Sequence, residues 1–208
     1  MTTTEVRERV GARMPGVVKD RRVALSVALG LMLLAAACGG SLYKVKPKVD
    51  APVTGGREAG AGGLIVRAAP LLADEESQDL FEANLPLGGL LPLRLEIGNE
   101  SGAALSFKRV CFHLRDSDGH EWKLRSPKQA VSRVLTDNQV YLYNPNSRKK
   151  FEAAVAEHAF DLKTPLETSK QRRGLLFFQT PKKEPIGDQR GLVLTIEGLP
   201  QPIEVIIN

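Results

Sequence analysis

The chain has 208 residues, of which 42% are hydrophobic, and it carries 29 basic and 24 acidic side chains. The residues before Cys38 hold six of the basic and three of the acidic side chains, which leaves 23 against 21 and a net charge near +2 for the remainder. This balance argues against a nucleic-acid-binding domain, which would keep a concentrated basic face. The roughly 170 residues from Cys38 onward favour one domain with an extension.

An apolar run of about 15 residues ends at Cys38, and basic residues precede it. A positive flank, a short apolar run and small residues at its end are typical of a secretory signal peptide. The run is shorter than the roughly 20 residues that a membrane-spanning helix needs. We therefore expect residues 1–37 to be a signal peptide that is removed on export.

The end of this run, residues 34–38 (LAAAC), resembles the lipobox of bacterial lipoproteins, with Ala35 where leucine is usual. The resemblance implies cleavage before Cys38, lipidation of that cysteine and attachment to a membrane of the bacterial envelope. Gly39 follows the cysteine where an aspartate would imply retention at the inner membrane, so the resemblance implies the outer membrane. An ordinary signal peptide and an uncleaved anchor are the alternatives.

Residues 38–63 are rich in Gly, Pro, Lys and Ala. Glycine-rich chain stays flexible, and some 25 such residues reach about 25–30 Å on average. We therefore predict that this segment is a tether that holds a globular domain clear of the lipid surface.

Beyond the tether, residues 90–97 alternate strictly between apolar and other side chains, with Pro92, Arg94 and Glu96 on one face. Such alternation predicts a half-buried strand, and the proline confines it to a sheet edge or to the beginning of the strand. Residues 105–115 and 120–125 predict a hairpin around the turn 116–119, with a β-bulge near residues 108–109. Short runs dense in Val, Ile, Leu and Phe predict further strands at 64–66, 174–180, 191–197 and 203–207.

Two helices interrupt the predicted strands. Ser126, a proline at the next position and Gln129 form the pattern of a capping box, which predicts a short helix. Apolar residues in 147–162 recur at helical spacing and predict a second helix with one buried face. The excursion 126–163 is long for a connection inside a compact domain, so we expect an insertion packed on the strands.

About seven strands and two helices, without alternation of the two, predict a mainly β protein with an antiparallel sandwich. Residues 93–99, the DxDG hairpin at 116–119 and residues 173–178 resemble segments of immunoglobulin-like domains in secreted bacterial lipoproteins. The resemblance implies that residues 64–208 form an immunoglobulin-like β-sandwich carrying the helical insertion. The expected core comprises Leu93, Leu95, Ile97, Phe112, Leu114, Trp122, Phe177 and Ile196.

Motifs for catalysis or metal binding are weak. The chain has three histidines, and the sequence His120-Glu121 lacks the second histidine of a zinc-protease helix. Asp116 and Asp118 before a glycine match the beginning of a calcium loop, but the later glutamate is missing and hairpin turn chemistry explains these residues. We therefore predict no metal, no cofactor and no catalytic residue.

Three basic residues, Arg148, Lys149 and Lys150, are the candidate partner-binding site, because the apolar side of their predicted helix must face the domain. A plain solvated face, or a patch that meets anionic lipid, are the alternatives. Cys111 is predicted to be a small buried residue in a strand, with an intermolecular disulfide or a reactive thiol as the alternative. His158 lies on the apolar side of the same helix and is predicted to be a core or boundary residue.

These features together predict a membrane-anchored envelope lipoprotein that binds or assembles with an envelope protein and is not an enzyme. The alternative is an envelope hydrolase with paired carboxylates on its loops. Two carboxyl groups about 5–9 Å apart in a pocket would favour that alternative.

Overall fold

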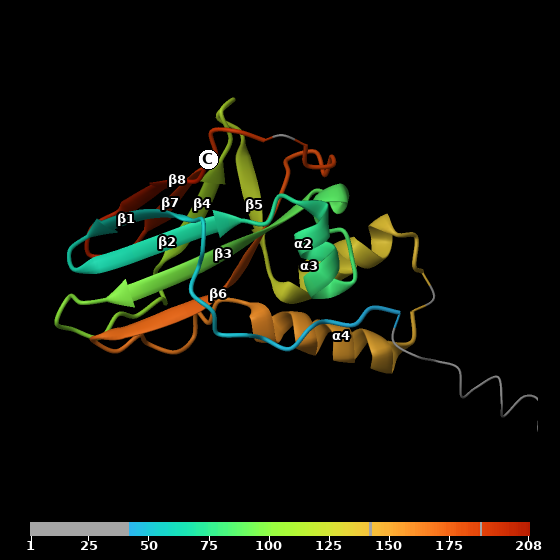
Figure 1. Ribbon diagram of the computed structural model, residues 1–208, viewed down its shortest axis with the longest axis horizontal. Coiled ribbons are helices and arrows are strands. Elements are labelled where there is room, and N and C mark those ends of the chain that lie inside the picture. The colour runs from blue at the N-terminus through green and yellow to red at the C-terminus, as the bar shows by residue number, and fades with distance from the viewer. Residues whose placement is uncertain (1–41, 142, 188) are drawn as a thin grey trace, which may run out of the picture. The chain divides into compact units, whose positions relative to one another are not determined.

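The computed structural model describes residues 42–141, 143–187 and 189–208 (Figure 1). All strand pairs in this part of the chain are antiparallel, and they join one sheet in the order β1-β2-β3-β6-β5-β4-β7-β8. The predicted signal peptide, the lipobox and Cys38 lie outside the described residues. The strands are β1 Arg57–Ala61, β2 Leu64–Pro70, β3 Leu90–Asn99, β4 Cys111–Arg115, β5 Glu121–Arg125, β6 Lys170–Gln179, β7 Val193–Glu197 and β8 Ile203–Ile206.

The sheet curls until its end strands, β1 and β8, lie side by side, which makes it nearly barrel-shaped (Figure 1). Along each strand, the apolar side chains at alternate positions fill the interior, since successive side chains of a strand point to opposite faces. In β3 these are the odd positions, from Leu91 to Ile97, as the alternation predicts. All eight expected core residues are buried, which confirms that prediction.

Three α-helices cover the outer face of β3 and β6 at one end of the sheet: α2 Asp74–Phe81, α3 Pro127–Asp137 and α4 Pro145–His158 (Figure 1). In β6, Leu176 and Phe178 point into the interior, whereas Leu175 and Phe177 pack against the helices. This strand is therefore buried on both faces, which explains its unbroken apolar run. None of the helices in the described ranges is long and apolar enough to cross a lipid bilayer.

The two predicted helices are confirmed, and their ends follow from local chemistry. Ser126 Oγ accepts a hydrogen bond from the Gln129 N–H (3.3 Å), and Gln129 Oε1 accepts one from the Ser126 N–H (2.9 Å), so the capping box is present. Helix α4 ends at His158, earlier than expected, because the next residues run beside β6 and the Phe160 N–H donates to the Leu175 carbonyl (2.9 Å). A Cβ at Gly174 would lie 2.5 Å from the backbone of Phe160, so this crossing requires glycine.

The predicted fold class holds at the level of a mainly β, antiparallel protein. The described residues form eight strands rather than about seven, and they include α2 in addition to the two predicted helices. The immunoglobulin-like sandwich is not confirmed, because β5 pairs with both β4 and β6 and so joins all strands into one sheet.

The predicted tether is wrong in its extent. Strand β1 lies within it, and the chain before β1 packs alongside α4 and crosses the sheet (Figure 1). Tyr43 is buried and stacks on Phe151 with ring centroids 5.1 Å apart. His158 Nε2 lies 2.7 Å from the Lys46 carbonyl oxygen, and the Lys46 N–H donates to the Leu80 carbonyl. The glycine-rich composition misled because the contacts that order the chain before β1 come from residues more than 30 positions away, such as Leu80, Glu96 and Phe151.

Two local predictions also need correction. The expected long strand 105–115 is strand only from Cys111, and a turn at residues 108–109 takes the place of the expected bulge. Leu105 instead pairs with Leu166 in an isolated bridge. Pro92 is near the beginning of its strand, as predicted, but that strand lies inside the sheet. The Pro92 carbonyl accepts a hydrogen bond from the Leu71 N–H, which lies just beyond the end of β2. The side on which the proline lacks an N–H is therefore the side where β2 has ended.

Candidate functional site

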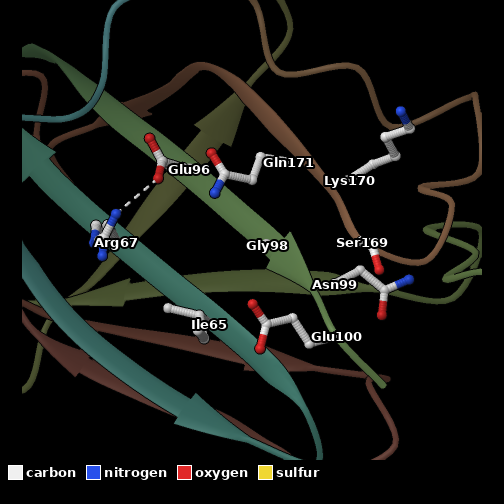
Figure 2. Close-up of a pocket in the computed structure, with 9 residues that line it drawn as sticks. All are labelled: Ile65, Arg67, Glu96, Gly98, Asn99, Glu100, Ser169, Lys170 and Gln171. Atoms are coloured by element: carbon white, nitrogen blue, oxygen red, sulfur yellow. Dashed lines mark hydrogen bonds and ion pairs between the residues drawn. The ribbon is translucent and has the colours of Figure 1, made fainter. Parts of the chain in front are cut away.

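A polar pocket of about 130 Å³ lies on the outer face of the sheet, over β2, β3 and β6 (Figure 2). The outward positions of these strands carry its side chains, because the alternate positions are committed to the interior. It is lined by Ile65, Arg67, Glu96, Gly98, Asn99, Glu100, Ser169, Lys170 and Gln171.

Glu96 is the buried charge of this pocket, with 4% of its side chain exposed. Its carboxylate accepts from Arg173 Nε (2.5 Å) and from Arg67 Nη1 (3.0 Å), and Figure 2 shows the pair with Arg67 reaching across from β2 to β3. Burial alone would raise the pKa of Glu96, but the hydrogen bonds from Arg173 and the Val53 N–H and the charges of both arginines outweigh it and lower that pKa. Glu96 is therefore ionised at neutral pH.

The other polar groups of the pocket are mostly engaged in holding the fold. Asn99 Nδ2 donates to the carbonyls of Ala103 (2.8 Å) and Leu166 (2.9 Å), and its Oδ1 accepts from Ser101. Glu100 also lines the pocket, so two glutamates share it. An acid–base pair of carboxyl groups needs one protonated member, and the lowered pKa of Glu96 makes it unsuited to be that member. The pocket is also smaller than the usual ligand site of about 300–1,000 Å³.

The candidate partner-binding residues separate into two groups. Arg148 is half-buried, and it donates to Glu152 Oε1 (2.8 Å) and to Ser132 Oγ (2.6 Å), so it links α4 to α3. Lys149 and Lys150 are exposed, on the side of α4 opposite to the buried Phe151 and Val155. The apolar stripe and the exposed basic face are thus both present, and Arg148 has a structural contact that the sequence did not predict.

Two adjacent basic residues in β6, Arg172 and Arg173, are engaged within the fold. Arg172 donates to the carbonyls of Asp161, Thr164 and Pro165 and lies over the Phe107 ring, 5.2 Å from its centroid, so it fixes the loop before β6. Its neighbour Arg173 pairs with Glu96.

Asp116, Asp118 and His120 have ligand atoms within 4.8 Å of one another, in the turn between β4 and β5. Asp116 Oδ1 accepts from the N–H groups of Asp118 (3.1 Å) and His120 (2.9 Å), and its Oδ2 accepts from Trp122 Nε1 (3.1 Å). Burial opposes ionisation, but these hydrogen bonds outweigh it and lower the pKa of Asp116. The carboxylate closes the hairpin and holds the indole, which is turn chemistry and agrees with the prediction for these residues.

His158 is buried as predicted, with its ring edge-on to Phe81 (centroids 5.7 Å apart). Cys111, by contrast, is exposed, which contradicts the prediction of a buried thiol. Phe112 and Leu114 point into the sheet, so alternation turns Cys111 to the outside. The helices cover only the other end of the outer face, which leaves this residue in solvent.

Comparison of the chain with known protein families, with functionally characterised proteins and with solved structures found no match. Sequence reasoning missed the buried pairing of Glu96 with Arg67 and Arg173. The alternation placed Glu96 outward, but only the order of the strands brings β2 and β6 to either side of β3.

Proposed function

We propose that this protein is a lipid-anchored binding or assembly module of the bacterial envelope, attached at Cys38 and placed in the outer membrane. The lipobox-like end of the apolar run supports the anchor, and Gly39 supports the outer membrane. The partner is an envelope protein that meets the exposed basic face of α4. The pocket of Figure 2 gives little support to catalysis, because the lowered pKa of Glu96 makes it unsuited to act as a general acid there.

The observation that carries this proposal is the position of Tyr43 on α4. Tyr43 packs on Phe151, and it follows Cys38 by only five residues. Five extended residues span at most about 18 Å. A lipid on Cys38 would therefore keep α4, which carries Lys149 and Lys150 on its exposed side, close to the membrane surface. Its partner would be met there, and not at the end of a long tether.

Replacing Cys38 with serine is expected to stop maturation of the chain and its labelling by fatty acid. The thiol is the acylated group in the lipoproteins that residues 34–38 resemble, and serine has no thiol. Metabolic labelling with a radioactive fatty acid, followed by gel electrophoresis, measures the result. Cys111→Ser is the matched control and should leave labelling unchanged. Equal labelling of the Cys38 variant and the unchanged chain would rule out this anchor.

The double substitution Lys149→Glu and Lys150→Glu is expected to remove an envelope protein partner while changing the free energy of unfolding by less than about 0.5 kcal/mol. Both side chains are exposed, so the change acts on surface charge and not on packing. The measurement is a pull-down from envelope extract with the intact acylated protein, beside chemical denaturation.

Lys108→Glu with Lys163→Glu makes the same change of charge at exposed positions away from α4 and is the control for that pull-down. The control variant should keep the partner. If the variant at Lys149 and Lys150 retains every partner of the unchanged protein, this face of α4 is only a solvated surface.

A further inference from the structure

A cleft of about 360 Å³ opens between helix α3 and the ends of β5 and β6, at the end of the sheet that the helices cover. Its lining contains hydrogen-bond donors and positive charge, and no acidic residue is part of it. The basic side chains are Arg125, Lys128, Arg133 and Lys183, and the uncharged polar ones are Gln129, Ser132, Thr136 and Gln179.

Gln179 lines this cleft with an amide that lacks a full set of partners. The residue is 3% exposed, and its Oε1 accepts from Arg125 Nε (2.8 Å). That bond fixes which end of the amide is oxygen, since an arginine can only donate. Among the described residues, Nε2 of Gln179 is the buried side-chain nitrogen without a hydrogen-bond partner. A buried polar group without a partner lowers stability, and an acceptor bound within its reach would remove that cost.

The charges around this amide are only partly balanced. Arg133 donates to Asp137 Oδ1 (3.1 Å) and to the carbonyls of Gly88 and Lys183, so its charge is shared with one acid beside the cleft. Within the described ranges, no hydrogen bond or ion pair engages the ammonium groups of Lys128 and Lys183 or the Nη atoms of Arg125. The cleft therefore presents an excess of positive charge, and Gln179, whose buried Nε2 lacks a partner, is part of its wall.

We propose that this cleft binds the phosphate group of a small phosphate ester. Its hydrogen-bond donors come from β5, β6, α3 and the segment after β6. They approach from more directions than the two oxygens of a carboxylate can serve. A phosphate offers three or more acceptor oxygens and about −1.5 to −2 charges at neutral pH. Arginine and lysine side chains are the usual partners of such groups in proteins. The volume leaves room for an organic group beyond the phosphate, and the proposal does not depend on the anchor at Cys38.

Titration of the full chain with inorganic phosphate, at constant ionic strength set with chloride, tests this site. In NMR spectra of ¹⁵N-labelled protein, the side-chain amide signal of Gln179 is expected to shift with saturation as phosphate is added. Gln179→Glu keeps the acceptor for Arg125 but replaces the donor by a negative charge, so binding should weaken about tenfold or more. The pair Lys128→Gln with Lys183→Gln should weaken it about threefold to tenfold.

The matched control is Lys108→Gln with Lys163→Gln, which removes two charges at exposed positions that do not line the cleft and should leave phosphate binding unchanged. Melting curves without phosphate show that each variant is folded. Glycerol 3-phosphate then shows whether the site takes a phosphate ester or free phosphate. Tighter binding than that of inorganic phosphate supports an ester, such as a lipid head group, and equal binding indicates free phosphate instead of an ester. If the Gln179 signal does not respond, or if all variants bind phosphate alike, the cleft is not a phosphate site.

Discussion

Replacing Trp122 with alanine is expected to lower the free energy of unfolding by about 3–5 kcal/mol. The indole is 2% exposed inside the sheet, opposite Leu114 on β4. Its Nε1 also donates to Asp116 Oδ2, so the substitution removes both the packing of the ring and a bond that closes the hairpin turn. Urea denaturation followed by circular dichroism measures the effect, because the chain has a single tryptophan and the variant loses that fluorescent probe.

Two variants separate packing from the hydrogen bond. Trp122→Phe keeps most of the ring contact and loses the donor, so it should cost about 1–3 kcal/mol. Tyr141→Ala removes an aromatic ring that is 76% exposed and should stay within about 0.5 kcal/mol. In the unchanged protein the fluorescence maximum should be that of a buried indole. Emission typical of an indole in water would contradict the position of β5 in the sheet.

Replacing Arg173 with methionine is expected to lower the free energy of unfolding by about 1–3 kcal/mol, because it takes one of two cationic partners from a nearly buried carboxylate. The cost should be smaller when Glu96 is already glutamine, since the neutral amide needs no cation. A double-mutant cycle of the two positions, measured by urea denaturation, gives the coupling between them. Equal costs in both backgrounds would show that the two residues do not interact.

The same carboxylate predicts a dependence of stability on pH. The pKa of Glu96 is lowered in the folded protein, so its contribution is fully present above the ordinary glutamate pKa of about 4.3 and is lost as the pH falls through the lowered value. Unfolding free energies measured at decreasing pH should therefore fall less steeply for Glu96→Gln than for the unchanged protein. Glu167→Gln, at an exposed position, should follow the unchanged protein. If the unfolding free energy of Glu96→Gln falls with decreasing pH as steeply as that of the unchanged protein, the lowered pKa of Glu96 does not contribute to stability.

Features that depend on neighbours in the sequence could be predicted from it. The alternation in β3 and β4 gave the buried face of each strand, because side chains of a strand point to opposite sides. Ser126 and Gln129 located the start of α3, since a capping box satisfies N–H groups within one turn. The spacing of Phe151, Val155 and His158 likewise gave the buried face of α4.

Features that depend on distant segments were decided only by the tertiary structure. Contacts with α4 order Tyr43 and the chain before β1. The local sequence does not reveal these contacts, so the glycine-rich composition of the segment suggested a tether. The exposure of Cys111 depends on which end of the sheet the helices cover.

The charged and polar sites show the same division. Glu96 is on the outward face that alternation predicts, but its burial requires β2 and β6 on either side and the segment that carries Val53 above it. The cleft at Gln179 exists because α3 packs beside the ends of β5 and β6, which are far apart along the chain. Sequence thus determined most of the elements and their buried faces through contacts within a few residues. The closing of the sheet and both pockets were decided by contacts between strands and helices that no local pattern encodes.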